Sequence, residues 1–207
     1  MKILELIIDE NDESGVEAVA LVDSPAIQSE WMSFKKEEIE KAFKFKIQNE
    51  EKRIVSGYLM IADLPIVRMS DEGEIFHVVF RKNTIEKIVN KFMQKGLNGS
   101  INLMHDANQK AEGVYLIESL IIDDKRKVFA PEGFEKVSNG SWWGSMRVEN
   151  DSIWEKIKSG EFRGFSVEGM FGQSVEIDIP DRVVEKIKKV VKRYKQNKIS
   201  QKRLKTK

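Results

Sequence analysis

The sequence predicts an α+β fold in which strands predominate. Short apolar stretches typical of strands recur between residues 53 and 172, and only two stretches in that region repeat apolar residues at helical spacing. The chain has 207 residues, of which 41% are hydrophobic. This length and composition suit one domain with appendages, or at most two small domains.

The N-terminal elements are two short strands and a helix. Residues 2–9 and 16–22 are predicted to be strands around the turn-prone stretch 11–15. Ser33 can cap a charged helix over about 35–47, because the apolar residues of that segment fall on one stripe.

The central elements begin with a strand at 53–61. Residues 66–69 and 74–80 are predicted to be the two arms of a hairpin. The clearest helix follows, because apolar residues recur at helical spacing after Asn83, a favourable cap, until Gly96 supplies a C-terminal stop.

The remaining elements of the central region are mostly strands. Residues 101–105 form a predicted strand that ends at a histidine, and 114–122 form a long apolar strand. Strands at 141–148 and 165–171 flank a short helix at 153–157.

The net charge of +1 conceals an asymmetry along the chain. Residues 182–207 carry 12 Lys and Arg against one Glu, a net charge of +11, so the preceding 181 residues carry a net charge of −10. We therefore divide the chain into an acidic leader (1–52), a central domain (53–175) and a basic C-terminal helix and tail (176–207). The apolar stripe within 181–198 predicts an amphipathic helix.

The composition excludes several classes of function. No stretch approaches the roughly 20 apolar residues of a membrane span. Glu5 interrupts the first apolar run, which also lacks a small-residue cleavage site, so we expect no secretory signal. Without cysteine, the chain can form no disulfide, thiolate zinc site or cysteine nucleophile. There is no Gly-rich phosphate loop, paired-histidine metal motif or EF-hand spacing.

Three residues could carry chemistry. His105 closes a predicted strand, where a rigidly held base can still reach a substrate; the alternative is a histidine that only bonds a loop. Ser166 lies between Gly164 and Gly169, near the Gly-x-Ser-x-Gly elbow of serine hydrolases but one residue out of register; the alternative is a serine kept for packing. Alternation places Ser166 and Glu168 on one side of their strand.

Glu118 is the third candidate, a carboxylate inside the long apolar strand 114–122. Burying it is costly without a partner, and an imidazolium would supply one; alternatively that face of the strand is solvated. Asp123 and Asp124 are competing acids at the end of the same strand. His77, the other histidine, has no nearby acid pattern and is interpreted as structural.

Three segments carry a resemblance to a known family: Met104-His105-Asp106, Glu118-Ser119 and the block 153–169, which contains Gly-Phe-Ser. Within about 53–172 the sequence resembles the XkdF-like group of phage serine proteases. That group belongs with the prohead (procapsid maturation) proteases of tailed phages, which are similar in fold to herpesvirus assemblin.

The resemblance implies a small, mostly antiparallel, β-barrel-like sheet flanked by helices. It implies an endopeptidase in which Ser166 attacks the peptide bond, His105 is the general base and Glu118 is the third member of the site, with no cofactor. Assemblins use a second histidine, but His77 precedes His105 and does not match that position.

The implied function is a prohead maturation protease that cleaves scaffold and capsid-protein extensions within procapsids assembling in the host cytoplasm. Its partners would be those substrates, further copies of itself, and an acidic surface on which the basic tail docks. The alternative is a non-enzymatic virion or assembly protein that uses the same fold for binding. Membrane binding is not expected. Nucleic-acid binding is the least favoured of the functions considered, because the body is acidic and lacks a basic, aromatic face.

Overall fold

The computed structural model describes residues 3–9, 13–25, 43–69, 73, 75–134 and 136–176. Its elements in chain order are β1 (Ile3–Ile7), β2 (Gly15–Val22), β3 (Lys46–Asn49), β4 (Ile54–Met60), β5 (Ile66–Met69), β6 (Ile75–Phe80), α2 (Lys82–Gln94), the 3₁₀ turn η1 (Leu97–Gly99), β7 (Ile101–Leu103), β8 (Asp106–Lys110), β9 (Val114–Ile121), β10 (Trp142–Val148), α3 (Asp151–Lys158), β11 (Gly164–Met170) and β12 (Gly172–Glu176). The described part is therefore mostly β with two α-helices, which confirms the α+β class.

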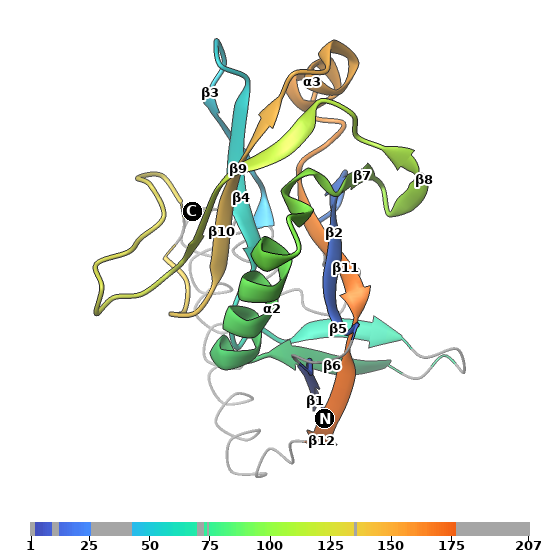
Figure 1. The fold of residues 1–207 in the computed structure, drawn as a ribbon, viewed down its shortest axis with the longest axis vertical. Coiled ribbons are helices and arrows are strands. Elements are labelled where there is room, and N and C mark those ends of the chain that lie inside the picture. Colours follow the sequence, from blue (N-terminus) through green and yellow to red (C-terminus); the bar gives the residue numbers. More distant parts are fainter. Residues whose placement is uncertain are drawn as a thin grey trace, which may run out of the picture.

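The strands form three four-stranded sheets, with the orders β12-β1-β6-β5, β3-β4-β10-β9 and β11-β2-β7-β8 (Figure 1). Most pairs are antiparallel, as expected; β1 with β6 and β2 with β7 are parallel. The hairpin of β5 and β6 is confirmed, because these strands pair antiparallel. Within the described residues each sheet is open, so a closed barrel is not formed there.

One core joins the sheets, and α2 lies at its centre. In Figure 1, α2 stands between the sheet of β9 and β10 and the sheet of β2 and β11. Most of its apolar stripe is buried, although Met93 is exposed. Phe92 meets Trp142 of β10 at 5.2 Å between ring centroids. The helical spacing of apolar residues predicted α2 correctly because most of those residues pack into the core, and tertiary packing supplies most of the stability of such a helix.

The ends of the two helices follow local rules. Gly96 has a φ of 66°, the left-handed conformation that stops α2 and that glycine adopts at little cost. The cap of α2 is Arg81, not Asn83, and it makes no side-chain cap hydrogen bond. In α3 the side chain of Asn150 accepts a hydrogen bond from the backbone N–H of Ile153.

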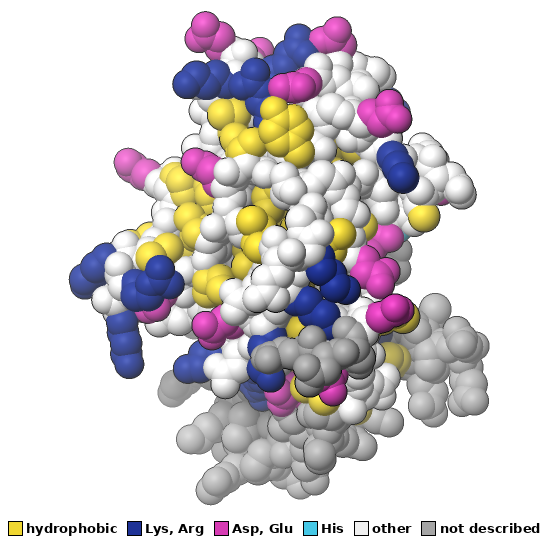
Figure 2. Space-filling view, viewed as in Figure 1, with side chains coloured by type: hydrophobic (Ala, Val, Ile, Leu, Met, Phe, Trp, Pro, Cys, Tyr) yellow, Lys and Arg dark blue, Asp and Glu magenta, His cyan; other side chains and the backbone are white. Residues whose placement is uncertain are grey.

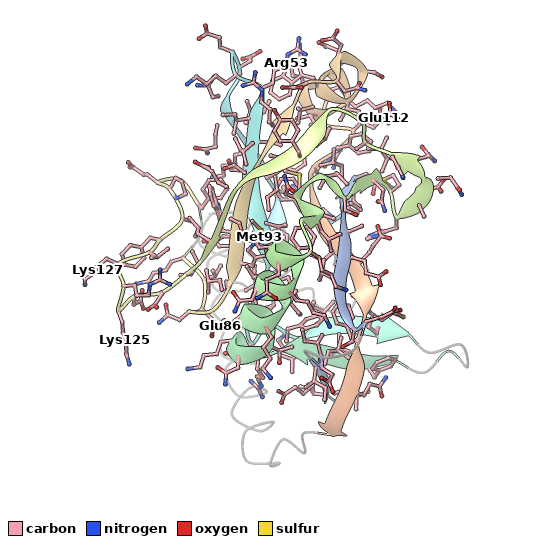
Figure 3. All side chains as sticks on the ribbon, in the orientation of Figure 1. Arg53, Glu86, Met93, Glu112, Lys125 and Lys127 are labelled. Atoms are coloured by element: carbon pink, nitrogen blue, oxygen red, sulfur yellow. The ribbon has the colours of Figure 1, made fainter. Side chains whose placement is uncertain are left out.

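A second, smaller core covers the outer face of the sheet of β4, β9 and β10. Phe134, from the loop between β9 and β10, packs edge-on against Tyr58 and Trp143. Lys125 and Lys127 point outward from the same loop (Figure 3). Acidic and basic side chains are mixed over the face in Figure 2, with apolar side chains showing between them over β9 and β10.

The helix expected over 35–47 is wrong at its C-terminal end. Residues 46–49 form β3, which pairs antiparallel with β4. The apolar residues in this segment have a spacing that suits either element when the run is short, and the pairing with β4 decides for the strand. The remainder of that helix lies outside the described residues, as does the helix expected at 181–198.

The two N-terminal strands do not pair with each other. Strand β1 lies between β12 and β6, whereas β2 lies between β11 and β7. The leader predicted at 1–52, which also contains β3, thus contributes one strand to each of the three sheets. In the described part of the chain, neither helix could cross a bilayer, since α2 has 13 residues and α3 has 8.

Candidate active site

The candidate site is built on one face of the sheet β11-β2-β7-β8. The register pairs Ser166 on β11 with Ala20 on β2, and Ala20 with Asn102 on β7. Directly paired residues project from the same face of a sheet, so these three side chains form one row across three strands. Phe165 and Leu21, the neighbouring pair, project to the opposite face and are fully buried in the main core.

Glu168 stands on the same face as Ser166, two residues further along β11 and opposite Ala18. The side chain of Asn102 donates from Nδ2 to Glu168 Oε1 at 2.7 Å, reaching across β2. Ala18 and Ala20 are the β2 residues beneath this contact, and their side chains are too short to separate the two partners. The small side chains of β2 therefore allow β7 and β11 to share a polar site.

His105, in the turn between β7 and β8, contacts the same carboxylate. Its Nδ1 lies 3.0 Å from Glu168 Oε1, and its side chain is 44% exposed. Asn102 and His105 thus contact one oxygen of Glu168. Because the imidazole uses Nδ1 for this contact, Nε2 is left for another partner.

The backbone that carries His105 is unusual. Leu103 pairs with Asp106 around a two-residue turn, in which Met104 and His105 have φ angles of 54° and 63°. A two-residue hairpin turn with positive φ at both positions normally takes Asn or Gly, because other L-residues pay about 1 kcal/mol or more each in this region. Met104 is tied by its N–H to the carbonyl of Leu21 at 3.0 Å. The turn therefore holds the imidazole over the sheet at a local conformational cost.

Ser166 is nearly buried, with 8% of its surface exposed. It makes no side-chain hydrogen bond to His105 in the described structure. Ser166 and Glu168 are two residues apart on an extended strand, so their Cα atoms are about 7 Å apart and their side chains are neighbours on one face. Catalytic hydrogen bonds are often long without substrate and shorten when it binds.

The glycines around Ser166 serve close packing and form no nucleophile elbow. Ser166 lies inside β11 rather than at a strand-to-helix turn. A Cβ atom at Gly164 would come within 2.7 Å of Pro25 and the carbonyl of Phe43, and one at Gly169 would lie 1.8 Å from the carbonyl of Gly15. Contacts this short leave no space for a side chain, which explains both glycines.

Asp106, next to His105, is occupied by its own turn. Its carboxylate accepts from Gln109 Nε2 at 2.8 Å and from the backbone N–H of Asn108 at 2.9 Å. These hydrogen bonds, that of Gln109 first, hold the pKa of Asp106 below its ordinary value. Asp106 therefore belongs to the hairpin turn rather than to the imidazole.

The structure places Glu118 in a different sheet from His105. Glu118 lies on β9, where its carboxylate accepts a hydrogen bond from Ser145 on β10, and Ser145 in turn shares a 2.7 Å hydrogen bond with Ser56 on β4. Of the three predicted residues, the structure brings Ser166 and His105 to one sheet face and puts Glu118 elsewhere.

The competing acids and the second histidine are also away from His105. The Asp123 carboxylate accepts from two backbone N–H groups of its own loop, and the N–H of Asp124 donates to Asn139. His77 lies on β6, where its Nδ1 is buried without a hydrogen-bond partner and desolvation lowers its pKa. In the described residues, no three His, Asp or Glu side chains gather as metal ligands.

Sequence reasoning missed Asn102 and the role of Glu168. Alternation correctly placed Ser166 and Glu168 on one side of their strand. It could not identify His105 as the neighbour of Glu168, because that contact depends on β2 lying between β11 and β7.

A serine hydroxyl, an imidazole and a carboxylate that holds the imidazole through Nδ1 are the groups that serine hydrolases use, and here they share one face of a sheet. The chain belongs to the family described as "Putative phage serine protease XkdF", whose model matches residues 43–176. No curated protein and no solved structure matches the chain.

Proposed function

We propose that the protein is a serine endopeptidase with Ser166 as nucleophile, His105 as general base and Glu168, in place of Glu118, as the acid that orients the base. The observation that carries the proposal is the 3.0 Å contact between His105 Nδ1 and Glu168, on the sheet face that also presents Ser166. Membership of a family described as phage serine proteases supports the same reaction class.

The proposed reaction follows from the roles of these groups. His105 Nε2 accepts the proton of Ser166 as Oγ bonds to the substrate carbonyl carbon, and the imidazolium then gives that proton to the departing amine. The acyl group leaves Ser166 when His105 activates a water in the same way. Glu168 accepts a hydrogen bond from Nδ1–H and stabilises the imidazolium, and backbone N–H groups near Ser166 stabilise the oxyanion.

Asn102 is a positioning residue in this scheme. Asn102 is 5% exposed, so its end of the hydrogen bond to the partly buried Glu168 is shielded from water, and the bond contributes more than a fully exposed one would. Because Asn102 fixes the carboxylate and the carboxylate fixes the ring, the imidazole has one preferred orientation over the sheet.

The biological reaction we propose is prohead maturation, the cleavage of scaffold and capsid-protein extensions inside assembling procapsids. Membership of a phage family supports a reaction that takes place during phage assembly. A fold related to that of assemblin is a further part of this proposal. Residues 182–207, with 12 basic residues against one acidic residue, would dock on an acidic scaffold surface or on the acidic body of a neighbouring copy.

Co-expression with the candidate capsid and scaffold proteins of the same phage tests the function. Intact mass should show truncated capsid or scaffold chains with the wild type and full-length chains with Ser166→Ala. A matched control is Ser145→Ala, which removes the hydroxyl of another buried strand serine, one that contacts Glu118 on a different sheet. Full-length chains in every sample, with Ser166 inert to a serine-directed label, would instead favour a non-enzymatic assembly protein.

Truncation after Ile179 tests the tail separately. The shortened protein should still cleave a soluble peptide and should fail to process procapsids. Unchanged processing of procapsids would remove the docking role from the tail.

A further inference from the structure

A cavity of about 420 Å³ lies against Ser166, along the edge of β11 that faces away from β2. Consecutive residues of β11, from Ser166 to Gly169, form one wall of it. In Figure 1, β11 runs from the level of α3 down to the level of β5, and β12 continues below it. The chain thus passes from one sheet to another here, and the corner between the sheets leaves space beside the serine.

Most of the other residues that line the cavity are apolar, and four further strands contribute to them. They include Leu6 of β1, Leu59 of β4, Ile66 of β5 and Phe80 of β6. Phe80 is fixed by Phe171, with ring centroids 5.0 Å apart, and Leu59 and Phe80 belong to the main core. The shape of this wall is therefore set by the packed interior of the protein and not by loose surface side chains.

The size of the cavity suits a large side chain. A cavity of about 150 Å³ is enough to hold a benzene ring, so this one has space for a large aliphatic or aromatic side chain together with part of its backbone. Its volume also falls within the range of roughly 300–1,000 Å³ in which proteins bind small ligands.

The charges around the cavity favour neither sign of ionised side chain. Among the described residues that line it, Glu168 and Arg68 carry opposite charges, on different strands. Each ion would be attracted by one of them and repelled by the other, and either ion would lose part of its water against the apolar residues. An uncharged, apolar side chain does not incur this loss of hydration.

We propose that this cavity is the substrate subsite that selects the cleavage position, and that it takes a large apolar side chain, Leu, Met, Ile or Phe, within two residues of the cleaved bond. This inference rests on the proposed peptidase function. The cavity shares the wall of β11 with Ser166, so a side chain inserted in it places the adjoining peptide bond beside the hydroxyl.

Ile66 is the residue through which to test the subsite. It lies on β5, the edge strand of its sheet, and is only partly buried, so a larger side chain can be accommodated there. Ile66→Trp should fill the cavity. Ile117→Trp is the matched control, because Ile117 is an exposed isoleucine on another edge strand, β9, and does not line this cavity.

The experiment measures two rates for the full chain and both variants. The first is labelling of Ser166 by a small alkyl fluorophosphonate, in which Ser166 Oγ bonds to phosphorus, fluoride leaves and the hydroxyl proton passes to His105. The second is cleavage of a synthetic peptide library, with the cut sites identified by mass spectrometry.

For the wild type we expect large apolar residues to be favoured over Ala by about tenfold or more at one position within two residues of the cut. Ile66→Trp should lower cleavage at those sites by a similar factor while its fluorophosphonate labelling stays within about twofold of the wild type, and Ile117→Trp should change neither rate. A labelled wild type with no apolar preference, or an unchanged preference in Ile66→Trp, would overturn the subsite alone. A wild type that is not labelled at Ser166 would overturn the peptidase function and the subsite with it.

Discussion

His105 and Glu168 meet through a 3.0 Å contact between imidazole Nδ1 and a carboxylate oxygen, although β2 separates their parts of the sheet. Two features of the chain make the contact possible. The turn at Met104 and His105 adopts positive φ at both residues, and the β2 residues beneath the site are alanines. In the proposed mechanism, His105 Nε2 then accepts the proton of Ser166.

The first prediction separates the two glutamates. Glu168→Gln should lower kcat/KM by about 10² to 10⁴, because the imidazolium loses its charged partner and its fixed orientation. Glu118→Gln should stay close to the wild type, since its carboxylate contacts Ser145 on another sheet. Steady-state kinetics on one peptide substrate measures both. The reverse ranking of these variants would return the third position of the site to Glu118.

Asn102 should affect catalysis through Glu168. Asn102→Ala should lower kcat by about tenfold with little change in KM, because the residue positions the carboxylate and has no assigned contact with substrate. Asn108→Ala, at an exposed position of the neighbouring hairpin, is the control. A rise in KM at constant kcat would assign Asn102 to substrate binding instead.

Ser166 and His105 should act as one unit. Ser166→Ala, His105→Ala and the double variant should lose activity to a similar extent, because each change disables the same proton transfer and attack. Substantial cleavage by either single variant is incompatible with the nucleophile–base pair. Ser166→Ala should also keep the melting temperature of the wild type within a few degrees, because it removes only one hydroxyl group.

The glycines of the site strand make a prediction about stability. Gly169→Ala should destabilise the fold by about 1–3 kcal/mol or more, since the new Cβ would lie 1.8 Å from the carbonyl of Gly15 and force β11 and β2 apart. Gly99→Ala, where nothing lies within 4 Å of the added atom, should be near neutral. Thermal denaturation compares them, and equal melting temperatures would contradict the close approach of the two strands.

The pH dependence of stability should include a contribution from His77. Desolvation lowers the pKa of His77 below its ordinary value of 6.5 in the folded protein, so the unfolded chain binds more protons once the pH falls below that value. Stability should therefore fall as the pH drops through about 6.5, and fall less in His77→Gln. Denaturant titrations at pH 7.5 and 5.5 test this, and equal pH dependence in both proteins would exclude His77 as a source.

The elements that could be predicted from the sequence are those whose signal is local. The stripe of α2, its stop at Gly96 and the period-two alternation of β11 are properties of one segment, and each is confirmed. Residues 46 and 47 were wrongly assigned to a helix, because the local spacing of apolar residues does not reveal that this segment pairs with β4. The site shows the same division: Ser166 and His105 could be singled out by residue type and position, whereas Glu168 and Asn102 required the order β11-β2-β7.

The most direct test of the central claim is covalent labelling by an alkyl fluorophosphonate, mapped to a residue by peptide mass spectrometry. We expect one modification, on Ser166, that is abolished in Ser166→Ala, slowed by about 10² or more in His105→Ala and unaffected in Ser145→Ala. A wild-type protein that stays unlabelled at Ser166, or that labels equally fast without His105, would contradict the assignment of Ser166 and His105 as a nucleophile and its base.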